Sequence, residues 1–283
     1  VKAATPRRFQ RQQTTLFKQT QPPPIRRQIA SLADEAWLIA AKTSNLANKI
    51  EQHRTEARRQ LAFSILGRGC TTANTEITKP DAVTPPISAK NIPWSDNKDR
   101  DDTCKDADDA KNMASDALVT DMLCICSVKH KTGYQACGAT ITAGTGDLST
   151  KSGSKAKAFT RWELVSTACA GLTKGMHDTL SPSAIAEALA NFYSDLGANW
   201  LAQAELTDYT NNNDQRNTIY GVHALAGGTK ANCSSDNTPL NAGGKGVCIN
   251  YAKTLQDNKE ISWVKHMRNA AKELQAASDI FKQ

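Results

Sequence analysis

The sequence predicts an all-α fold, an elongated antiparallel helical bundle or coiled coil with long disulfide-stapled loops. First, apolar residues recur in alternating steps of four and three from Ile25 to Gln60. Second, alanine is frequent and aromatic residues make up only 6% of the chain, which suits slim helices packed closely together. Third, eight cysteines lie mostly in Gly-, Ser- and Asp-rich segments, a pattern typical of an oxidised, secreted chain. We therefore expect a single elongated domain over residues 25–283.

The first element is a long helix with a heptad seam. The residues on this seam are Ile25, Ile29, Leu32, Ala36, Ile39, Thr43, Leu46, Ile50, His53, Ala57 and Gln60. The spacing predicts a coiled-coil helix of roughly 40 residues, about 60 Å long. Residues 1–24 are basic and end in Pro22-Pro23-Pro24, so we expect an extended lead-in that stops where the helix begins. Gly67 and Gly69 are expected to end the helix.

The middle of the chain alternates between loops and helices. Residues 71–103 contain four prolines and no helical period, so they predict a long loop. Small residues at helical spacing predict a second helix from about Thr103 to Ile125, followed by a surface loop over 127–157. An apolar stripe from Phe159 to Met176 predicts a third helix.

The last third begins with a clear helix start. Ser181-Pro182 combines an N-cap residue with proline at the first helical position, and the apolar stripe that follows extends to Trp200. Residues 207–250 are rich in Asn, Gly, Asp and Thr and predict a large irregular loop excursion. A final helix is expected from about residue 258 to 281, again on a four-and-three seam.

The cysteines suggest how the loops are stapled. Cys233 and Cys248 flank part of the 207–250 excursion and are expected to pair. Cys124 and Cys126 cannot readily bridge to each other, so each needs a different partner. We assign them to a cluster with Cys137 and expect Cys169 to join one of the two. Cys70 and Cys104 flank the proline-rich loop and are expected to close it.

Composition and motifs exclude several classes of function. The formal net charge is +7, and residues 1–68 hold thirteen Lys or Arg against four Asp or Glu. These basic residues are not interleaved with stacking aromatics, so we expect no nucleic-acid binding. Neither a catalytic constellation nor a metal or cofactor motif accompanies the five histidines, and we expect no enzyme activity, no metal and no cofactor. No apolar run reaches the length of a membrane span, and the start at Val1 predicts a processed or trimmed ectodomain.

Three sequence blocks resemble a known family. The blocks are Leu123-Cys124-Ile125-Cys126 with Ala136-Cys137-Gly138, then Leu189 to Gly197, and then Val247-Cys248-Ile249-Asn250-Tyr251 with Ile261-Ser262-Trp263-Val264-Lys265. In this order, after a long heptad helix, they resemble the B-type N-terminal domain of trypanosome variant surface glycoproteins. The resemblance implies a rod built on two long antiparallel helices with lobes of loops, carried on the parasite surface by a C-terminal glycolipid anchor outside this chain. It implies no catalytic residues.

The chain departs from the family pattern in two ways. Family N-terminal domains are commonly several tens of residues longer, and the basic lead-in is not typical of coat proteins. In length the chain resembles a shortened member of the family that binds and neutralises the trypanolytic apolipoprotein L of human serum in the endosomal system. That resemblance implies a secretory-pathway protein at the cell surface, flagellar pocket and endosome or lysosome. The alternative is an ordinary glycoprotein of the antigenic coat, and a homodimer is left open.

The long helix is the expected binding element, because an amphipathic partner helix can continue its seam. The candidate residues are Lys49, His53, Arg54, Arg58 and Arg59. The alternative is an ordinary solvated charged face. His53 lies on the seam, so acidification is expected to give it a positive charge. If the partner helix supplies a carboxylate, this charge should strengthen binding. The alternative interpretation is a buried histidine that stays neutral. One sequon, Asn232-Cys233-Ser234, makes Asn232 a candidate glycosylation site.

Overall fold

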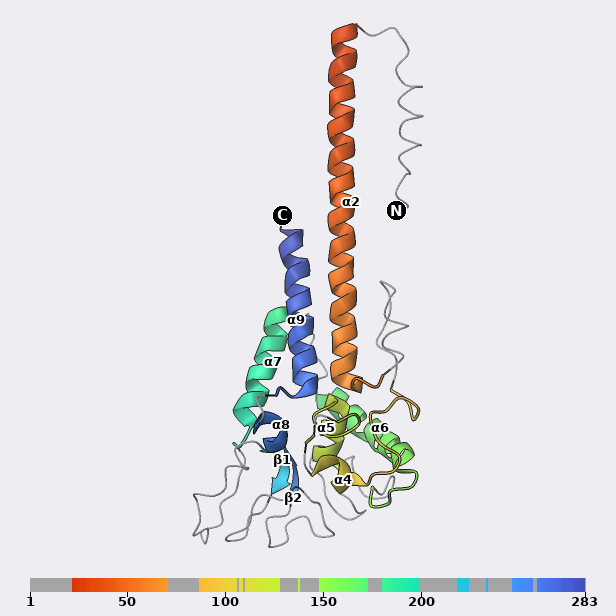
Figure 1. Cartoon of the computed structure of the whole chain (residues 1–283), viewed down its shortest axis with the longest axis vertical. Coiled ribbons are helices and arrows are strands. Elements are labelled where there is room, and N and C mark those ends of the chain that lie inside the picture. The colour runs from red at the N-terminus through yellow and green to blue at the C-terminus, as the bar shows by residue number, and fades with distance from the viewer. Residues whose placement is uncertain are drawn as a thin grey trace.

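The computed structural model describes residues 22–70, 87–105, 107–108, 110–127, 137, 148–172, 180–198, 218–223, 233, 246–256 and 259–282. It is mostly helical and confirms the predicted all-α class. In chain order the elements are α2 (Pro23–Leu66), α4 (Arg100–Cys104), α5 (Leu118–Cys126), α6 (Ser154–Leu172), α7 (Pro182–Asp195), β1 (Thr218–His223), β2 (Gly246–Asn250), α8 (Ala252–Gln256) and α9 (Ser262–Phe281). Figure 1 shows α2 as a long rod with the short elements gathered at its lower end.

Helix α2 confirms the predicted long helix. It has 44 residues and begins at Pro23, where prolines occupy the first helical positions and lose no intrahelical hydrogen bond. It ends at Leu66, and the next residue, Gly67, has a φ of 75° and donates its backbone N–H to the Phe63 carbonyl at 2.9 Å. Glycine adopts this left-handed conformation without a steric penalty, so the predicted stop signal is confirmed. Residues 1–21 of the predicted lead-in lie outside the described residues.

Helix α9 packs antiparallel on the lower half of α2. His53 contacts Glu273, and seven residues further along α2, Gln60 contacts His266. Small side chains, Ala57 and Ala62 on α2 and Ala270 and Ala277 on α9, are buried and permit close approach of the two helices. Figure 1 shows α7 on the opposite side of α9 from α2. The Phe192 ring of α7 meets the Trp263 ring of α9 edge-on, with centroids 4.7 Å apart.

The main core lies at the lower end, where α4, α5, α6, α8 and the two strands meet the start of α9. Its largest fully buried apolar side chains include Trp94, Leu123, Ile249, Tyr251 and Ile261. The core joins segments that are far apart in the sequence, so this end of the rod is a compact head rather than a set of separate loops.

The predicted continuous helix from Thr103 to Ile125 is wrong. The chain forms the short helix α4, then turns, and resumes helical structure in α5. In the intervening turn, Asn112 and Ser115 have φ values of 62° and 82°, which no helix accommodates. The turn is held from outside, because Trp263 donates its backbone N–H to the Ser115 carbonyl at 3.3 Å and Ala107 donates to Asn250 at 2.9 Å.

The predicted irregular excursion over 207–250 contains regular structure. Strands β1 and β2 pair antiparallel, with Thr218 opposite Asn250 and Ile219 opposite Ile249, and the register is irregular between Tyr220 and Val222. These two strands were not predicted. The other residues of the excursion, apart from Cys233, lie outside the described residues.

The remaining helices follow their predicted starts more closely than their ends. Ser181 caps α7, accepting a hydrogen bond from the Ala184 N–H at 3.1 Å, as predicted. Helix α7 ends at Asp195, before Leu196, and Trp200 lies outside the described residues. Helix α6 begins at Ser154, five residues before the predicted stripe, and α9 begins at Ser262.

Three disulfides brace the head. Cys233 is joined to Cys248, which confirms the predicted staple, and Cys126 is joined to Cys137 within the predicted cluster. Cys104 is joined to Cys124. The predicted Cys70–Cys104 closure is therefore wrong, and neither Cys124 nor Cys126 is joined to Cys169. The physical reason is the turn after α4, which brings Cys104 back against α5, with the two Cα atoms 5.4 Å apart.

Candidate partner-binding site

The predicted seam histidine is already paired within the chain. The His53 Nδ1 lies 2.7 Å from Glu273 Oε2, and both side chains are about one-third exposed. The prediction placed His53 correctly on the inner face of α2. It did not foresee that α9, rather than a partner, supplies the carboxylate.

Two of the four predicted basic residues are also paired, in both cases along α2 itself. Arg58 lies 3.2 Å from Glu51, and Arg59 bonds to Glu56. Burial raises the pKa of Glu56, but hydrogen bonds from Gln60 and Arg59 outweigh it and hold the pKa below its usual value. Because exposed pairs of this kind contribute little to stability, they reduce the local positive charge more than they fix the helix.

Lys49 and Arg54 carry the positive charge that remains on this face. Both side chains are exposed, and within the described part of the chain neither forms an ion pair. Both lie alongside the second half of α9, because the neighbouring His53 contacts Glu273 and α9 continues to Phe281. Of the five predicted residues, three are therefore paired within the chain, and two are exposed and form no ion pair with a described residue.

A second histidine, which the sequence analysis did not single out, lies on the same helix contact. His266 of α9 is 2.7 Å from Gln60 Oε1, and its ring centroid is 5.4 Å from that of Phe63. Burial lowers the pKa of His266, and the nearby positive charges of Arg68 and Lys265 lower it further. The predicted seam of the last helix does not include His266 or Glu273. The signal in the sequence is their spacing of seven residues, which places both on one side of that helix.

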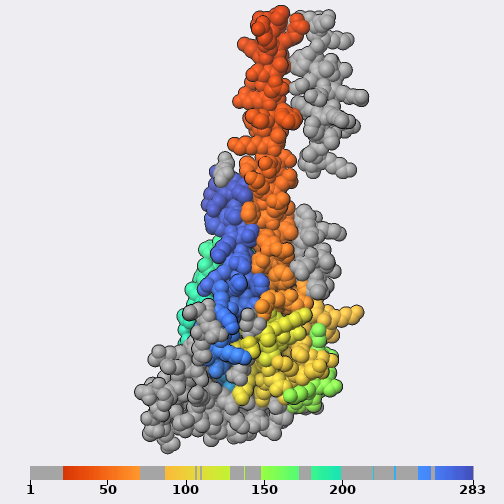
Figure 2. Space-filling view, viewed as in Figure 1, coloured from red at the N-terminus to blue at the C-terminus, as the bar shows by residue number. Residues whose placement is uncertain are grey.

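The upper part of α2 extends beyond α9. Helix α9 continues for only about two turns past Glu273, whereas α2 continues for roughly eight turns from His53 towards its start. Figures 1 and 2 show α2 rising well above the end of α9. Three seam residues there are exposed: Ile25 at 41%, Leu32 at 64% and Ile39 at 59%. No described helix covers this stretch, so an apolar seam faces outward over about six turns.

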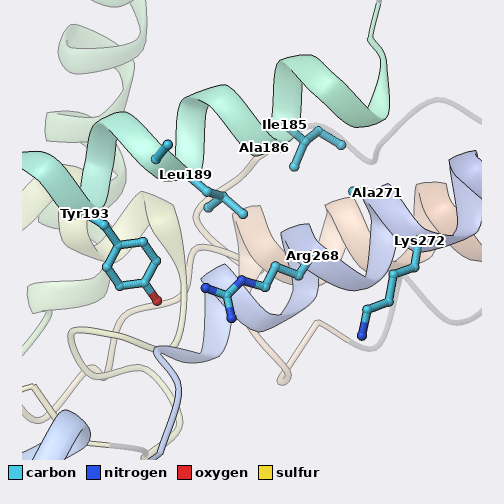
Figure 3. Close-up of a pocket in the computed structure, with 8 residues that line it drawn as sticks. Ile185, Ala186, Leu189, Tyr193, Arg268, Ala271 and Lys272 are labelled. Carbon is cyan, nitrogen blue, oxygen red and sulfur yellow. The ribbon is translucent and has the colours of Figure 1, made fainter.

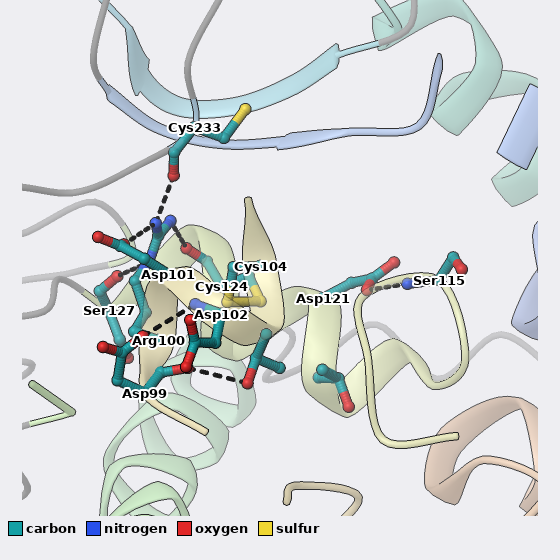
Figure 4. Close-up of a disulfide and its surroundings, with 12 residues drawn as sticks. Asp99, Arg100, Asp101, Asp102, Cys104, Ser115, Asp121, Cys124, Ser127 and Cys233 are labelled. Carbon is teal, nitrogen blue, oxygen red and sulfur yellow. Dashed lines mark hydrogen bonds and ion pairs between the residues drawn. A yellow bond between two sulfur atoms is a disulfide. The ribbon is translucent and has the colours of Figure 1, made fainter. Parts of the chain in front are cut away.

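The head below is held by a fully buried arginine (Figure 4). The Arg100 guanidinium donates hydrogen bonds to the Cys124 carbonyl at 2.7 Å, the Cys233 carbonyl at 2.6 Å and the Ser127 carbonyl at 3.2 Å. Asp101 lies 3.1 Å from it and partly balances its charge. Arg100 therefore ties the backbone of two disulfides to α4.

Two buried carboxylates connect the head to the helices. Asp121 accepts hydrogen bonds from Tyr251 at 2.6 Å, Trp263 at 2.7 Å and the Ser115 N–H at 2.8 Å. Burial raises the pKa of Asp121 to about 6, although these three hydrogen bonds work against that shift. Asp116 bonds to Arg68, just past the end of α2, at 3.1 Å. These contacts lock the start of α9 and the end of α2 onto the head.

The described residues show neither a metal site nor a membrane span. No group of three or more His, Cys, Asp or Glu in the described ranges could hold a metal ion. Asp108 instead lies 2.6 Å from Lys253. Among the helices described, none is both long and apolar enough to cross a membrane. Asn232 lies outside the described residues, so its glycosylation stays a prediction; the neighbouring Cys233 is buried.

The fold and the site together define a class: a disulfide-braced, elongated helical domain whose long helix has an apolar seam that no described helix covers at its upper end. A comparison with family models matches residues 2–283 to the trypanosomal VSG domain. The chain belongs to the trypanosome variant surface glycoprotein family, as a B-type domain. Members of this family are structural proteins of the cell surface. A search of curated proteins found no match.

Proposed function

We propose that this surface glycoprotein binds and neutralises the trypanolytic apolipoprotein L of human serum, conferring serum resistance without enzyme activity. In this proposal it resembles the serum resistance-associated protein of the same family. It would act in the secretory pathway, at the cell surface and flagellar pocket, and in the endosome or lysosome, held by a C-terminal glycolipid anchor.

The observation that carries the proposal is the open seam of upper α2. Leu32 and Ile39 lie on the same stripe that α9 covers lower down. Because α9 does not reach them, we expect a helix of the apolipoprotein to pack on this stretch as α9 packs below it. Lys49 and Arg54, which lie below this stretch and alongside α9, favour a partner helix whose end near α9 carries acidic residues. This placement moves the predicted binding region towards the start of α2.

The test compares two leucines of equal exposure. Leu32 and Leu38 are both 64% exposed, but only Leu32 lies on the seam. Binding of recombinant apolipoprotein L is measured by surface plasmon resonance for Leu32→Asp and for Leu38→Asp. Since burying a leucine contributes roughly 1.5–3 kcal/mol, we expect at least about a tenfold loss for Leu32→Asp and little change for Leu38→Asp. Equal effects would mean that the seam is not the binding surface.

The role of the two basic residues is tested separately. The double change Lys49→Glu with Arg54→Glu is expected to weaken binding, whereas Lys105→Glu, an exposed lysine in the head, is expected to leave it unchanged. Measurements at about pH 7.5 and about pH 5.5 bracket the cell surface and the endosome. If the parent chain binds no apolipoprotein L at either pH, the proposal is rejected.

The second candidate is a glycoprotein of the antigenic coat, which would serve immune evasion by shielding and antigenic variation. The match to the family domain over residues 2–283 favours it, because that match covers nearly the whole chain and singles out no specialised subset. A coat protein would show no specific binding of apolipoprotein L in the surface plasmon resonance measurement.

A further inference from the structure

A second surface, on the other side of α9 from α2, also has the features of a helix-binding site. Helices α7 and α9 enclose a groove of about 350 Å³ between them (Figure 3). Ile185 and Leu189 of α7 form its floor and are almost fully buried. The groove is separate from the face used in the proposed function and does not rest on it.

The walls of the groove are made of small residues. Ala186 and Ala190 of α7 are exposed and lie one turn apart, and Ala271 of α9 lies across from them. Alanines on both walls let another backbone approach closely, as ridges and grooves do when helices pack. A groove open along one side suits an elongated helical ligand better than an enclosed small molecule, which usually has most of its surface buried.

The two charged residues that line the groove are both basic. Arg268 and Lys272 of α9 line the groove one helical turn apart, and none of its eight described lining residues is acidic. Arg268 also pairs with Glu260 at 2.6 Å and lies over the Tyr193 ring at 5.6 Å, whereas Lys272 is exposed and forms no ion pair with a described residue. Burial raises the pKa of Tyr193, so its hydroxyl adds no negative charge at neutral pH.

We propose that the α7–α9 groove binds an acidic amphipathic helix of a partner protein. Apolar side chains four residues apart would lie over Ile185 and Leu189, and carboxylates one turn apart would face Arg268 and Lys272. Ile185 and Leu189 lie one helical turn apart, and so do Arg268 and Lys272. Both spacings match the spacing of side chains along one face of such a helix.

The experiment uses two fluorescein-labelled, end-capped helical peptides on the whole chain. Both carry leucines at four-residue spacing, and they differ only in having glutamates or lysines beside the leucine stripe. Fluorescence anisotropy is expected to show tighter binding of the glutamate peptide, with an affinity that falls as salt is raised. Equal affinity of the two peptides, or no binding of either, would overturn the proposal.

Variants locate the binding. Lys272→Glu should weaken the glutamate peptide by roughly fivefold and strengthen the lysine peptide, whereas Lys265→Glu, an exposed change on the same helix outside the groove, should do neither. Ala190→Trp should fill the groove and remove binding of both peptides. Leu32→Asp distinguishes the groove from the seam of upper α2, because it lies outside the groove and should leave the peptide affinity unchanged. If Leu32→Asp abolishes peptide binding, or if Lys265→Glu matches Lys272→Glu, the groove is not the site.

Discussion

Arg100 offers the sharpest test of how the head is held together. Its side chain is fully buried, and its guanidinium serves three backbone carbonyls, of Cys124, Ser127 and Cys233. In Arg100→Met the aliphatic stem is kept, but three buried acceptors lose their donor. At about 1–2 kcal/mol for each unsatisfied acceptor, and with the desolvation cost of the guanidinium recovered in part, we expect a loss of about 3 kcal/mol of unfolding free energy.

The assay is urea denaturation followed by tryptophan fluorescence, because Trp94 and Trp263 are both buried near the head. Arg100→Lys keeps the charge but cannot reach all three carbonyls, so its loss should be smaller than that of Arg100→Met. Asp101→Asn removes only the partly exposed ion-pair partner and should cost less than about 1 kcal/mol. A loss below about 1 kcal/mol for Arg100→Met would show that its three hydrogen bonds do not hold the head together.

Two further predictions concern the ends of the α2–α9 contact. Gly67→Ala should cost about 2 kcal/mol or more in a denaturant titration, because φ is 75° and the added Cβ would lie 2.7 Å from Asp116 Oδ2; Gly171→Ala, with no atom near its new methyl group, should be neutral or mildly stabilising. The pKa of His266 is lowered in the folded chain, so the unfolded chain takes up a proton first as pH falls below about 6.5. The contribution of His266 to the free energy of unfolding is therefore complete above that pH and is lost on acidification. His266→Gln should therefore show a smaller drop in unfolding free energy between pH 7 and 5 than the parent, and parallel pH curves would disprove the assignment.

The long elements were predictable because their signals are local. Gly67 and Ser181 act through their own backbone and side chain, and the heptad of α2 is a property of one segment. The failed helix over 103–125 shows the opposite case. Its alanines have helical spacing, but Ala107 and Ala114 are buried in a turn whose backbone groups bond to Asn250 and Thr103. Asn250 lies far outside any local window, and the Ala114–Thr103 bond spans 11 residues rather than the four of a helix, so contacts beyond the local pattern overrode the helical spacing.

Among the disulfides and the site residues, too, those that depend on nearby residues were predictable and those that depend on distant ones were not. Cys233 and Cys248 are close in the sequence and join across a local excursion, so their pairing was predictable. The Cys104–Cys124 bridge depends on the unpredicted turn between α4 and α5, and eight cysteines allow about 105 connectivities. His53 was placed on the correct face, but its partner Glu273 lies 220 residues away and could be identified only once the register of α9 was known.

The unequal lengths of α2 and α9 make the long helix a lever arm. Its fulcrum is the contact zone that contains His53 and His266, and roughly six turns project beyond it, about 30 Å at 1.5 Å per residue. A tilt of about 5° at the fulcrum would move the tip by roughly 3 Å, close to the diameter of a water molecule. A small change in the packing of α2 against α9 near the head would thus produce a larger displacement at the far end of α2.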